Sequence, residues 1–334
     1  MRVGFIGVSH WHAPLYYKPA ARLTNVRIVA VSDPNLSVAE TVGQELEARA
    51  FADYQELIEV RPDFIFAFGR HCDMPEIASA LIDEGIPFVI EKPDGLNFQQ
   101  VSAIRDRARA KGLHAGTGFN FRVSDLFKKI QAMTEEDPVT HASFRYIGVG
   151  GPYRYREVGN TWMLDPKLSG GGCTINLSVH FVDMFRIFSH STPREVTSLM
   201  GHFTWNLPIE DYSSMILRSP NSVCTIETGY TYPAPYNIFD ARFSLRTSRH
   251  YIVARNDDIV EIHRGCDGHM DQFSTKVFNA PWYPVFVSES IDRFAKGQPP
   301  VADLDDLAEV MKVIDAAYAS NRAGGRTVIL GDQK

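Results

Sequence analysis

Lys92 ends a short stretch whose residue types could bind or polarise a substrate oxygen. The apolar run Phe88-Val89-Ile90 has strand character and passes directly into Glu91-Lys92-Pro93. Proline restricts the preceding residue to extended conformations and cannot donate to a sheet, so we expect the strand to end at Lys92. Ligands of parallel sheets bind outside the carboxyl ends of the strands, where an ammonium could donate a hydrogen bond to a hydroxyl or carbonyl. The alternative is a solvated lysine that follows a strand.

His180 lies on a predicted helix and is a candidate for proton transfer. This helix, expected over about 173–189, follows Ser169-Gly170-Gly171-Gly172. Asn176, His180 and Asp183 recur at i, i+4 and i+7 and form a polar stripe on it. Of the three, only histidine has an ordinary pKa that suits proton transfer near neutrality. The glycines would let the backbone pack closely against another group, which we expect to be cofactor or substrate; a solvated stripe is the alternative.

The beginning of the chain has features of a dinucleotide-binding fold. A strand over Val3–Gly7 runs into a turn with one glycine of a GxGxxG motif, while Ser9 and His12 stand at the other two positions. A second strand ends in Asp33, where an acid can accept a hydrogen bond from the 2′-hydroxyl of NAD ribose. Such an acid repels a 2′-phosphate, so the pattern favours NAD over NADP. The alternatives are an ordinary strand-to-helix turn and, for Asp33, a turn residue before proline.

Three aromatic residues, His10, Trp11 and His12, occupy this first turn. Two histidines with no nearby cysteine or carboxylate make a poor zinc site, so we expect no metal. Imidazole N–H groups can donate to phosphate oxygens, and we therefore expect these residues to flank the cofactor.

A loop rich in aromatic and arginine residues is predicted before the glycine triplet. It contains Tyr153-Arg154-Tyr155-Arg156 and then Trp162. Such side chains beside a cleft suit the recognition of sugars or carboxylates, but they are equally common in loops that bind nothing.

Strand-like and helix-like segments alternate over the first ~120 residues, which is the pattern of a doubly wound parallel sheet. Helices are predicted over 36–48, 54–60, 75–84 and 97–110, and strands over 63–68 and 114–117 as well as those above.

The rest of the chain predicts an α+β domain with a large, mostly antiparallel open sheet. Strands with polar–apolar alternation are expected over 141–147, 195–203, 213–217, 223–227, 239–246, 250–255 and 259–263, and amphipathic helices over 124–133, 283–295 and 304–320. The exposed face of this sheet suggests a homodimer or homotetramer.

Composition indicates an ordinary globular protein. The 334 residues carry a net charge of −6 with no basic run, which argues against nucleic-acid and anionic-membrane partners. No apolar run approaches a membrane span, and strand residues begin at Arg2, so we expect no targeting segment. The four cysteines, Cys72, Cys173, Cys224 and Cys266, lack disulfide or zinc spacing, which suggests free thiols in the cytoplasm.

The order of these motifs resembles the Gfo/Idh/MocA family of NAD(P)-dependent oxidoreductases over nearly the whole chain. The residues that carry the resemblance are Gly7, Asp33, the run from Glu76 through Gly85 to Glu91-Lys92-Pro93, Gly118-Phe119-Asn120-Phe121-Arg122, the glycine triplet with His180 and Asp183, and the last two helices. The resemblance implies that Lys92 contacts both the reacting hydroxyl and the nicotinamide, and that His180 is the general acid/base.

Two positions depart from the family pattern. Asn176 stands where sugar and inositol dehydrogenases of the family often have aspartate; it cannot raise the basicity of His180 by charge, but it can hydrogen-bond a substrate hydroxyl. The segment Gly69-Arg70-His71-Cys72-Asp73-Met74 replaces a Thr-Pro-Asn pattern on the nicotinamide side.

We therefore expect an NAD(H)-dependent dehydrogenase or reductase that acts on a secondary alcohol or ketone of a sugar, polyol or cyclic polyol. One alternative is an enzyme that keeps NAD bound through a redox-neutral cycle, such as glycoside cleavage through a transient ketone. The other is a sugar sensor that binds the nucleotide without turnover.

The expected site spans a Rossmann domain over 1–120 and a substrate and oligomerisation domain over 121–334, whose last helices could pack back on the first. The expected catalytic residues are Lys92, His180 and Asn176. The expected cofactor contacts are Gly7, Ser9, His10, Trp11, His12, Asp33, Gly69, His71, Glu91 and Lys92. The expected substrate contacts are Lys92, Arg122, Tyr155, Trp162, Asn176 and His180.

Overall fold

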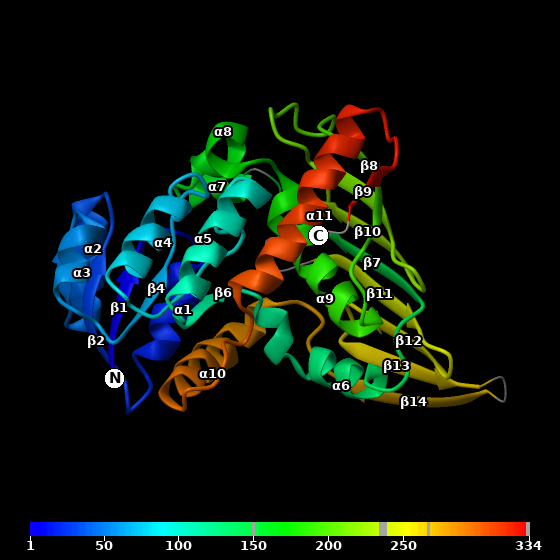
Figure 1. Ribbon diagram of the computed structural model, residues 1–334, viewed down its shortest axis with the longest axis horizontal. Helices are drawn as coiled ribbons and strands as arrows, with labels where there is room; N and C mark the ends of the chain where they lie inside the picture. Colours follow the sequence, from blue (N-terminus) through cyan, green and yellow to red (C-terminus); the bar gives the residue numbers. More distant parts are fainter. Residues whose placement is uncertain (149–150, 152, 234–238, 266–267, 332–334) are drawn as a thin grey trace.

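The computed structural model contains two sheets joined by a central helix (Figure 1). It describes residues 1–148, 151, 153–233, 239–265 and 268–331. Among them a six-stranded sheet occupies the N-terminal part and a nine-stranded sheet the C-terminal part, which confirms the predicted fold class.

The six-stranded sheet is parallel throughout, with strand order β3-β2-β1-β4-β5-β6. Its strands are β1 (Arg2–Ile6), β2 (Arg27–Ser32), β3 (Arg49–Phe51), β4 (Phe64–Ala67), β5 (Phe88–Ile90) and β6 (Ala115–Thr117). Its helices are α1 (Ala13–Ala20), α2 (Leu36–Leu46), α3 (Tyr54–Glu59), α4 (Met74–Asp83) and α5 (Phe98–Ala110).

The central strands of this sheet are apolar because both faces are covered. In β1, Phe5 belongs to one hydrophobic cluster and Ile6 to another, since successive side chains point to opposite faces. The first cluster also includes Phe286 and Ile291 of α10 (Tyr283–Ala295), so this late helix packs against α1 and the N-terminal sheet.

The nine-stranded sheet has the order β14-β13-β12-β11-β7-β10-β9-β8-β15. Only β7 and β10 pair in parallel among its described neighbours. The strands are β7 (His141–Ile147), β8 (Glu195–Gly201), β9 (Tyr212–Arg218), β10 (Val223–Gly229), β11 (Asp240–Arg246), β12 (His250–Arg255), β13 (Ile259–Arg264), β14 (His269–Ser274) and β15 (Val328–Ile329).

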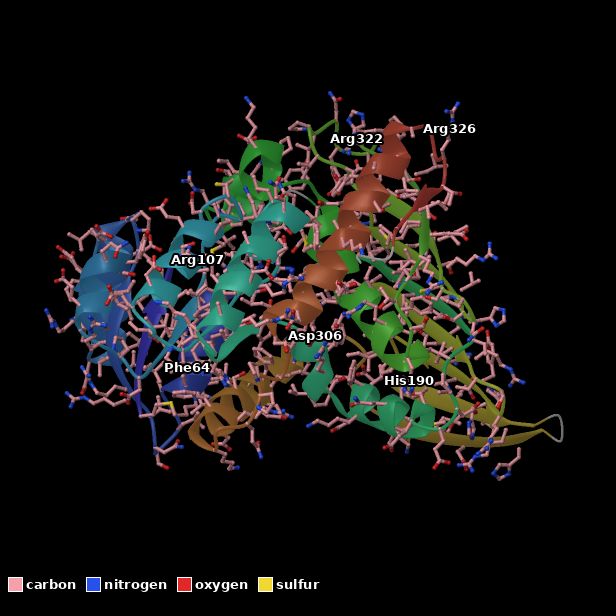
Figure 2. All side chains as sticks on the ribbon, viewed as in Figure 1. Phe64, Arg107, His190, Asp306, Arg322 and Arg326 are labelled. Carbon is pink, nitrogen blue, oxygen red and sulfur yellow. The ribbon has the colours of Figure 1, made fainter. Side chains whose placement is uncertain are left out.

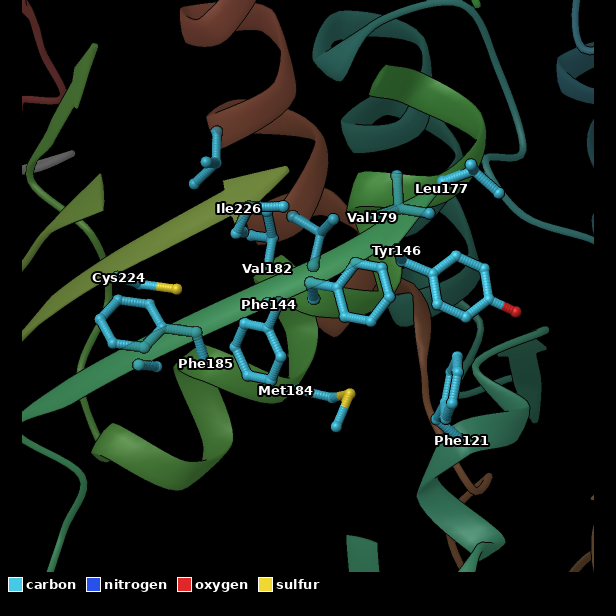
Figure 3. Packing of buried hydrophobic residues seen from close by; sticks show 14 of the residues in the cluster. Phe121, Phe144, Tyr146, Leu177, Val179, Val182, Met184, Phe185, Cys224 and Ile226 are labelled. Carbon is cyan, nitrogen blue, oxygen red and sulfur yellow. The ribbon is translucent and has the colours of Figure 1, made fainter. Parts of the chain in front are cut away.

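One face of this sheet is covered by α6 (Asp125–Thr134), α9 (Val179–Ser189) and α11 (Leu304–Arg322), and α11 also packs on α5 (Figure 1). Phe181 of α9 packs against Phe144 of β7 and Phe243 of β11. Figure 3 shows Phe144 among other buried apolar side chains such as Val182 and Phe185, and the hydroxyl of Tyr146 pointing away from the cluster. The opposite face carries exposed apolar residues such as Leu199 and Ile216, and assembly through it stays a prediction.

Several elements have no counterpart in the sequence prediction. These are α1, β3, β14, β15, two short helices, α7 (Tyr153–Glu157) and α8 (Pro166–Ser169), and a 3₁₀ turn, η2 (Thr161–Leu164). The predicted helix over 173–189 begins instead with a π-helical turn, η3 (Thr174–Ser178), and continues as α9.

Candidate active site

Lys92 and His180 line one cavity of about 270 Å³, although 87 residues separate them in the chain. We call it the Lys92 cavity. It lies where the carboxyl end of β5 meets η3 and α9, as the sequence predicts for a ligand site. Other residues that line it are Trp11, His12, Phe121, Tyr146, Arg154, Tyr155, Asn176, Asn279 and Tyr283.

Lys92 is buried, and its ammonium is held by a single residue. Its Nζ donates to the backbone oxygen of Asn176 at 2.6 Å and to Oδ1 of the same residue at 2.7 Å. Burial lowers the pKa of Lys92 to about 8, while the neighbouring Glu91 carboxylate limits the fall. An ammonium has three protons, so one is left for a ligand in the cavity.

Both amide protons of the Asn176 side chain are engaged by protein groups, while Oδ1 accepts one hydrogen bond and keeps one lone pair. Its Nδ2 donates to the hydroxyls of Tyr155 at 2.9 Å and Tyr230 at 2.8 Å, which turns Oδ1 toward Lys92. Asn176 therefore holds Lys92 in place, and has no free amide proton with which to orient a substrate as the sequence suggested. Its π-helical turn is a feature that occurs often at functional sites.

His180 is buried against the rings of Phe119 and Phe121. Burial, aided by the positive charge of Lys92, lowers the pKa of His180 well below its ordinary value, so the ring is neutral near pH 7. Its Nδ1 is buried without a hydrogen-bond partner among the described residues, which leaves Nε2 as the nitrogen available to a ligand.

The glycine triplet packs closely against protein groups, which explains its glycines; its predicted contact with cofactor or substrate stays a prediction. A Cβ atom on Gly171 would overlap the hydroxyl of Tyr318 in α11, and one on Gly172 would overlap the backbone oxygen of Glu210. The Glu210 carboxylate connects α11 to the start of η3, because it accepts from the Tyr318 hydroxyl at 2.8 Å and from the Thr174 amide at 2.9 Å. These contacts fix the start of η3.

Glu91 lies behind Lys92 and beside His12. Its Oε2 accepts from Tyr16 at 2.6 Å, and its Oε1 lies 3.2 Å from Nδ1 of His12 without hydrogen-bond geometry. Burial lowers the pKa of His12 well below its ordinary value, so this ring is neutral too. His12 and Trp11 line the Lys92 cavity, whereas the sequence placed them beside the cofactor.

Arg122, expected at the substrate, does not line the Lys92 cavity. Its guanidinium forms two hydrogen bonds to Asp183, at 2.6 and 2.9 Å, and one to Asp306 at 2.7 Å. Burial works against this charge, but the two carboxylates overcome it and raise the pKa of Arg122. Asp306 lies at the beginning of α11, between the two sheets (Figure 2), so Arg122 links η1 (Asn120–Val123), α9 and α11.

A second cavity, of about 710 Å³, lies at the carboxyl ends of β1, β2 and β4. We call it the Asp33 cavity. Its lining includes Gly7, Ser9, His10, Asp33, Gly69, Asn160 and Trp162. The volume falls in the range of ligand sites, and the position is that of a dinucleotide in a doubly wound fold.

The residues of the Asp33 cavity fit a dinucleotide. The Asp33 carboxylate accepts from the amides of Ser9 at 2.7 Å and Asn35 at 2.9 Å, and each oxygen keeps a lone pair for a ribose hydroxyl. The amide of His12 donates to Nδ1 of His10 at 3.1 Å, so the neutral His10 ring carries its proton on Nε2 and can donate it to a phosphate oxygen.

Packed aromatic rings lie at the boundary of the two cavities. His10 and Trp162 line the Asp33 cavity, Trp11 lines the Lys92 cavity, and the Trp11 ring centre lies 4.0 Å from that of His10 and 5.8 Å from that of Trp162. His71 supports Trp162 from the side, and its Nδ1 bonds the backbone oxygen of Ser169 at 2.6 Å. His71 itself lines neither cavity.

Several site residues were not among those expected from the sequence, including Tyr146, Tyr230, Tyr283, Asn279 and Arg154. Tyr230 follows β10 and Tyr283 begins α10, so only the tertiary fold brings them to Lys92. Arg154 stands in the aromatic–arginine run that the sequence did single out, but no periodicity shows which of its two arginines faces a cavity.

The described residues contain no metal-binding cluster and no membrane-spanning helix. Within the described ranges, no cluster of three or more histidine, cysteine or acidic side chains is arranged to hold a metal ion. Cys72, Cys173 and Cys224 are free thiols, and Cys266 lies outside the described residues. In the part of the chain that the structure describes, no helix combines the length and apolarity needed to cross a membrane.

The sequence relatives of the chain are distant, and each matches about half of it. The chain is 22% identical over 183 residues to glucose-6-phosphate 3-dehydrogenase of Bacillus subtilis, covering 54% of this chain and 51% of that protein. It is 24% identical over 195 residues to levoglucosan dehydrogenase of Pseudarthrobacter phenanthrenivorans, covering 55% and 48%. The chain thus spans about half the length of the curated relatives it matches.

Solved structures share the fold over almost the whole chain. GenD2 of gentamicin A biosynthesis in complex with NAD has a TM-score of 0.84 at 17% identity and covers 99% of this chain and 97% of its own. An Agrobacterium radiobacter oxidoreductase in complex with NAD+, L-tartaric acid and magnesium has a TM-score of 0.85 at 16% identity and covers 98% of each chain.

Family models match both parts of the chain. Residues 1–119 match the oxidoreductase family with an NAD-binding Rossmann fold, and residues 140–253 match the GFO/IDH/MocA C-terminal domain. The chain belongs to the Gfo/Idh/MocA family of oxidoreductases and carries its NAD-binding Rossmann domain.

Proposed function

We propose that the protein is an NAD-dependent dehydrogenase or reductase acting on a secondary alcohol or ketone of a monosaccharide or polyol. The observation that carries the proposal is that Lys92 and His180, an ammonium with one proton to spare and a neutral imidazole, line the same small cavity. That cavity adjoins a second one whose residues fit a dinucleotide.

Lys92 binds the reacting oxygen in this proposal. Its third proton donates to the substrate hydroxyl, and the positive charge stabilises the negative charge that grows on this oxygen as the hydroxyl proton leaves. Asn176 is a positioning residue that fixes the ammonium through both of its oxygens.

His180 moves the proton. Oxidation of a secondary alcohol to a ketone removes a hydride from carbon and a proton from oxygen. Bound NAD+ supplies the hydride acceptor, and Nε2 of the neutral His180 ring receives the proton. Reduction runs the same transfers backward, with His180 as the acid.

The names of the sequence relatives support a sugar substrate, since both curated proteins are dehydrogenases named for sugars. The cavity volume of about 270 Å³ suits one sugar ring.

The test is a screen of sugars and polyols with NAD and NADP, followed as NADH or NADPH absorbance, with Lys92→Met and His180→Asn as inactive references. We expect NAD-linked turnover of at least one sugar. Two outcomes would contradict the proposal: cofactor that copurifies and never accumulates as NADH while product forms, which indicates a redox-neutral cycle, or sugar-dependent partner binding with no turnover, which indicates a sensor.

A further inference from the structure

Arg154 is a cation in the wall of the Lys92 cavity and has no counter-charge among the described residues. It lies in α7, lines the cavity and is half-buried. Among the described residues it forms no hydrogen bond and no ion pair, and none of the residues that line this cavity is an acid. A guanidinium that lines a cavity without an acidic neighbour is placed to bind an anionic group of a ligand.

The other charges near the cavity do not provide that partner. Glu91 accompanies Lys92, whose pKa it raises against burial, and the two form an adjacent pair of opposite sign. Asp94 also lies behind Lys92 and acts on it in the same direction. His12 and His180 are neutral near pH 7, because burial lowers the pKa of each.

The positive charge of Arg154 shifts the pKa of groups on several sides of the cavity. It lowers the pKa of both Lys92 and His12, and it opposes the rise that burial causes in the pKa of Tyr146, Tyr155 and Tyr283. These five groups line the cavity from the segment after β5, the first turn, β7, α7 and α10, so the charge of Arg154 acts on several sides of the cavity.

We propose that the substrate is a monosaccharide-sized polyol that carries one anionic group, a carboxylate or a phosphate, and that Arg154 binds this group while Lys92 and His180 hold the reacting hydroxyl. The proposal rests on the proposed function for the identity of the reacting end. A guanidinium offers a planar pair of donors that matches both kinds of oxyanion. The volume of about 270 Å³ leaves room for one sugar ring and such a group.

A phosphate of the cofactor is the competing partner for Arg154. Arg154 lines the Lys92 cavity and not the Asp33 cavity, where the residues that fit a dinucleotide lie. The packed rings of His10, Trp11 and Trp162 lie at the boundary of the two spaces. The experiment separates these partners by measuring NAD affinity independently.

The first arm measures kcat/KM with NAD for matched sets built on glucose, galactose and mannose: the neutral sugar, its uronate, its aldonate and its 6-phosphate. We expect the acidic member of an accepted set to exceed its neutral parent by about a hundredfold, and Arg154→Gln to reduce that ratio to below about tenfold through KM. Arg154→Lys should retain part of the preference, because it keeps the charge but loses the planar fork. Which acid is preferred decides between carboxylate and phosphate.

Arg156→Gln is the matched control, since Arg156 lies two residues away on the same short helix, is exposed and does not line the cavity. It should behave as the wild type. Because Arg154 has no bond to another described residue, Arg154→Gln should unfold at the wild-type temperature.

The second arm needs no turnover. Thermal unfolding of the NAD-loaded protein is followed with gluconate, glucose 6-phosphate or the neutral polyol glucitol, and NAD affinity is measured by fluorescence. We expect an anion to raise the unfolding temperature, glucitol to leave it unchanged, and Arg154→Gln to abolish the shift while NAD affinity stays the same.

The outcomes separate the two proposals. Stabilisation by an anion through Arg154 without turnover would refute the dehydrogenase and leave the anion site standing. Turnover of neutral and acidic sugars at equal kcat/KM, or a ratio that Arg154→Gln does not change, would overturn the anion site and leave the dehydrogenase. Weakened NAD binding in Arg154→Gln with an unchanged ratio would assign Arg154 to the cofactor and overturn the inference.

Discussion

Lys92 reaches its position through contacts that connect distant parts of the chain. Asn176 accepts two of its protons, and Tyr155 and Tyr230 in turn hold the amide of Asn176. The ammonium is thus fixed before a ligand arrives, which is what electrostatic stabilisation of a developing oxyanion requires.

Removal of either reacting group should stop the chemistry and spare the cofactor. We expect Lys92→Met and His180→Asn each to lower kcat by about a hundredfold or more, because each loses a charge or a proton acceptor at the reacting oxygen. NAD affinity, measured by fluorescence, should stay close to the wild-type value. Lys167→Met, at an exposed lysine of α8, is the control. Near wild-type turnover in either active-site variant would remove the role assigned to it.

The pH dependence of oxidation should show an alkaline limb. The pKa of Lys92 lies at about 8, so its charge is lost above that pH and kcat/KM should fall about tenfold for each further pH unit. His180, whose pKa lies well below its ordinary value, stays neutral down to acid pH and should add no limb near 6.5. The Lys92→Arg variant should lack the alkaline limb, whatever its remaining rate, because arginine stays charged over this pH range. A rate that climbs steadily from pH 7 to pH 10 would show that neutral Lys92 is the active form.

For single residues, the sequence predicts the reactive side chains of the site better than it predicts the residues that contact them. Lys92, Asn176, His180 and Tyr155 do share a cavity, since strand ends and helical spacing can be read from residue order. Tyr230 and Tyr283 could not be found, because neither belongs to a local pattern and both reach the site through tertiary packing. The same holds for Arg122, whose two carboxylate partners lie 61 and 184 residues away.

Arg122 connects η1, α9 and α11, so its replacement should lower the free energy of unfolding. Arg122→Met leaves the almost fully buried Asp183 carboxylate without its main partner, which typically costs about 3–5 kcal/mol of unfolding free energy. Urea unfolding measures the loss, and KM of the folded variant should change less than about tenfold. The control is Arg145→Met, because the partly exposed pairs of Arg145 with Glu227 and Asp240 should contribute no more than about 1 kcal/mol. Unchanged stability together with a raised KM would instead make Arg122 a substrate ligand.

Element boundaries follow the sequence wherever a local signal exists. The helix α5 begins after Asn97, whose side chain accepts from the Gln100 amide at 3.0 Å, and α10 spans the predicted 283–295. The π-helical turn η3 has no such signal. It depends on the Glu210 carboxylate that binds the Thr174 amide, and therefore on the approach of a loop 36 residues further along the chain.

Several buried histidines tie the stability of the molecule to pH. His10, His12, His71 and His180 all have pKa values lowered by burial, so the folded state keeps them neutral where the unfolded chain takes up protons. Stability that is fully present above pH 6.5 is therefore lost as the pH falls below that value.

His71 makes this loss measurable, since its folded-state pKa is about 3 against an ordinary 6.5. Its contribution falls by about 1.4 kcal/mol for each pH unit below 6.5. The difference in unfolding free energy between the wild type and His71→Asn should thus shift by about 2 kcal/mol in favour of the variant between pH 7 and pH 5, measured in urea. His141→Asn, at an exposed histidine of β7, is the control. A pH-independent difference for His71→Asn would mean that His71 titrates normally in the folded protein.

The two sheets, the central helix α11 and the Arg122 network together bring β5 and η3 to one cavity (Figure 1). The most direct test of this account is a crystal structure of the protein with NADH and a sugar accepted in the screen. The account predicts one substrate oxygen within about 3.2 Å of both Lys92 Nζ and His180 Nε2. A sugar bound with none of its oxygens at either group, or bound outside the Lys92 cavity, would contradict it.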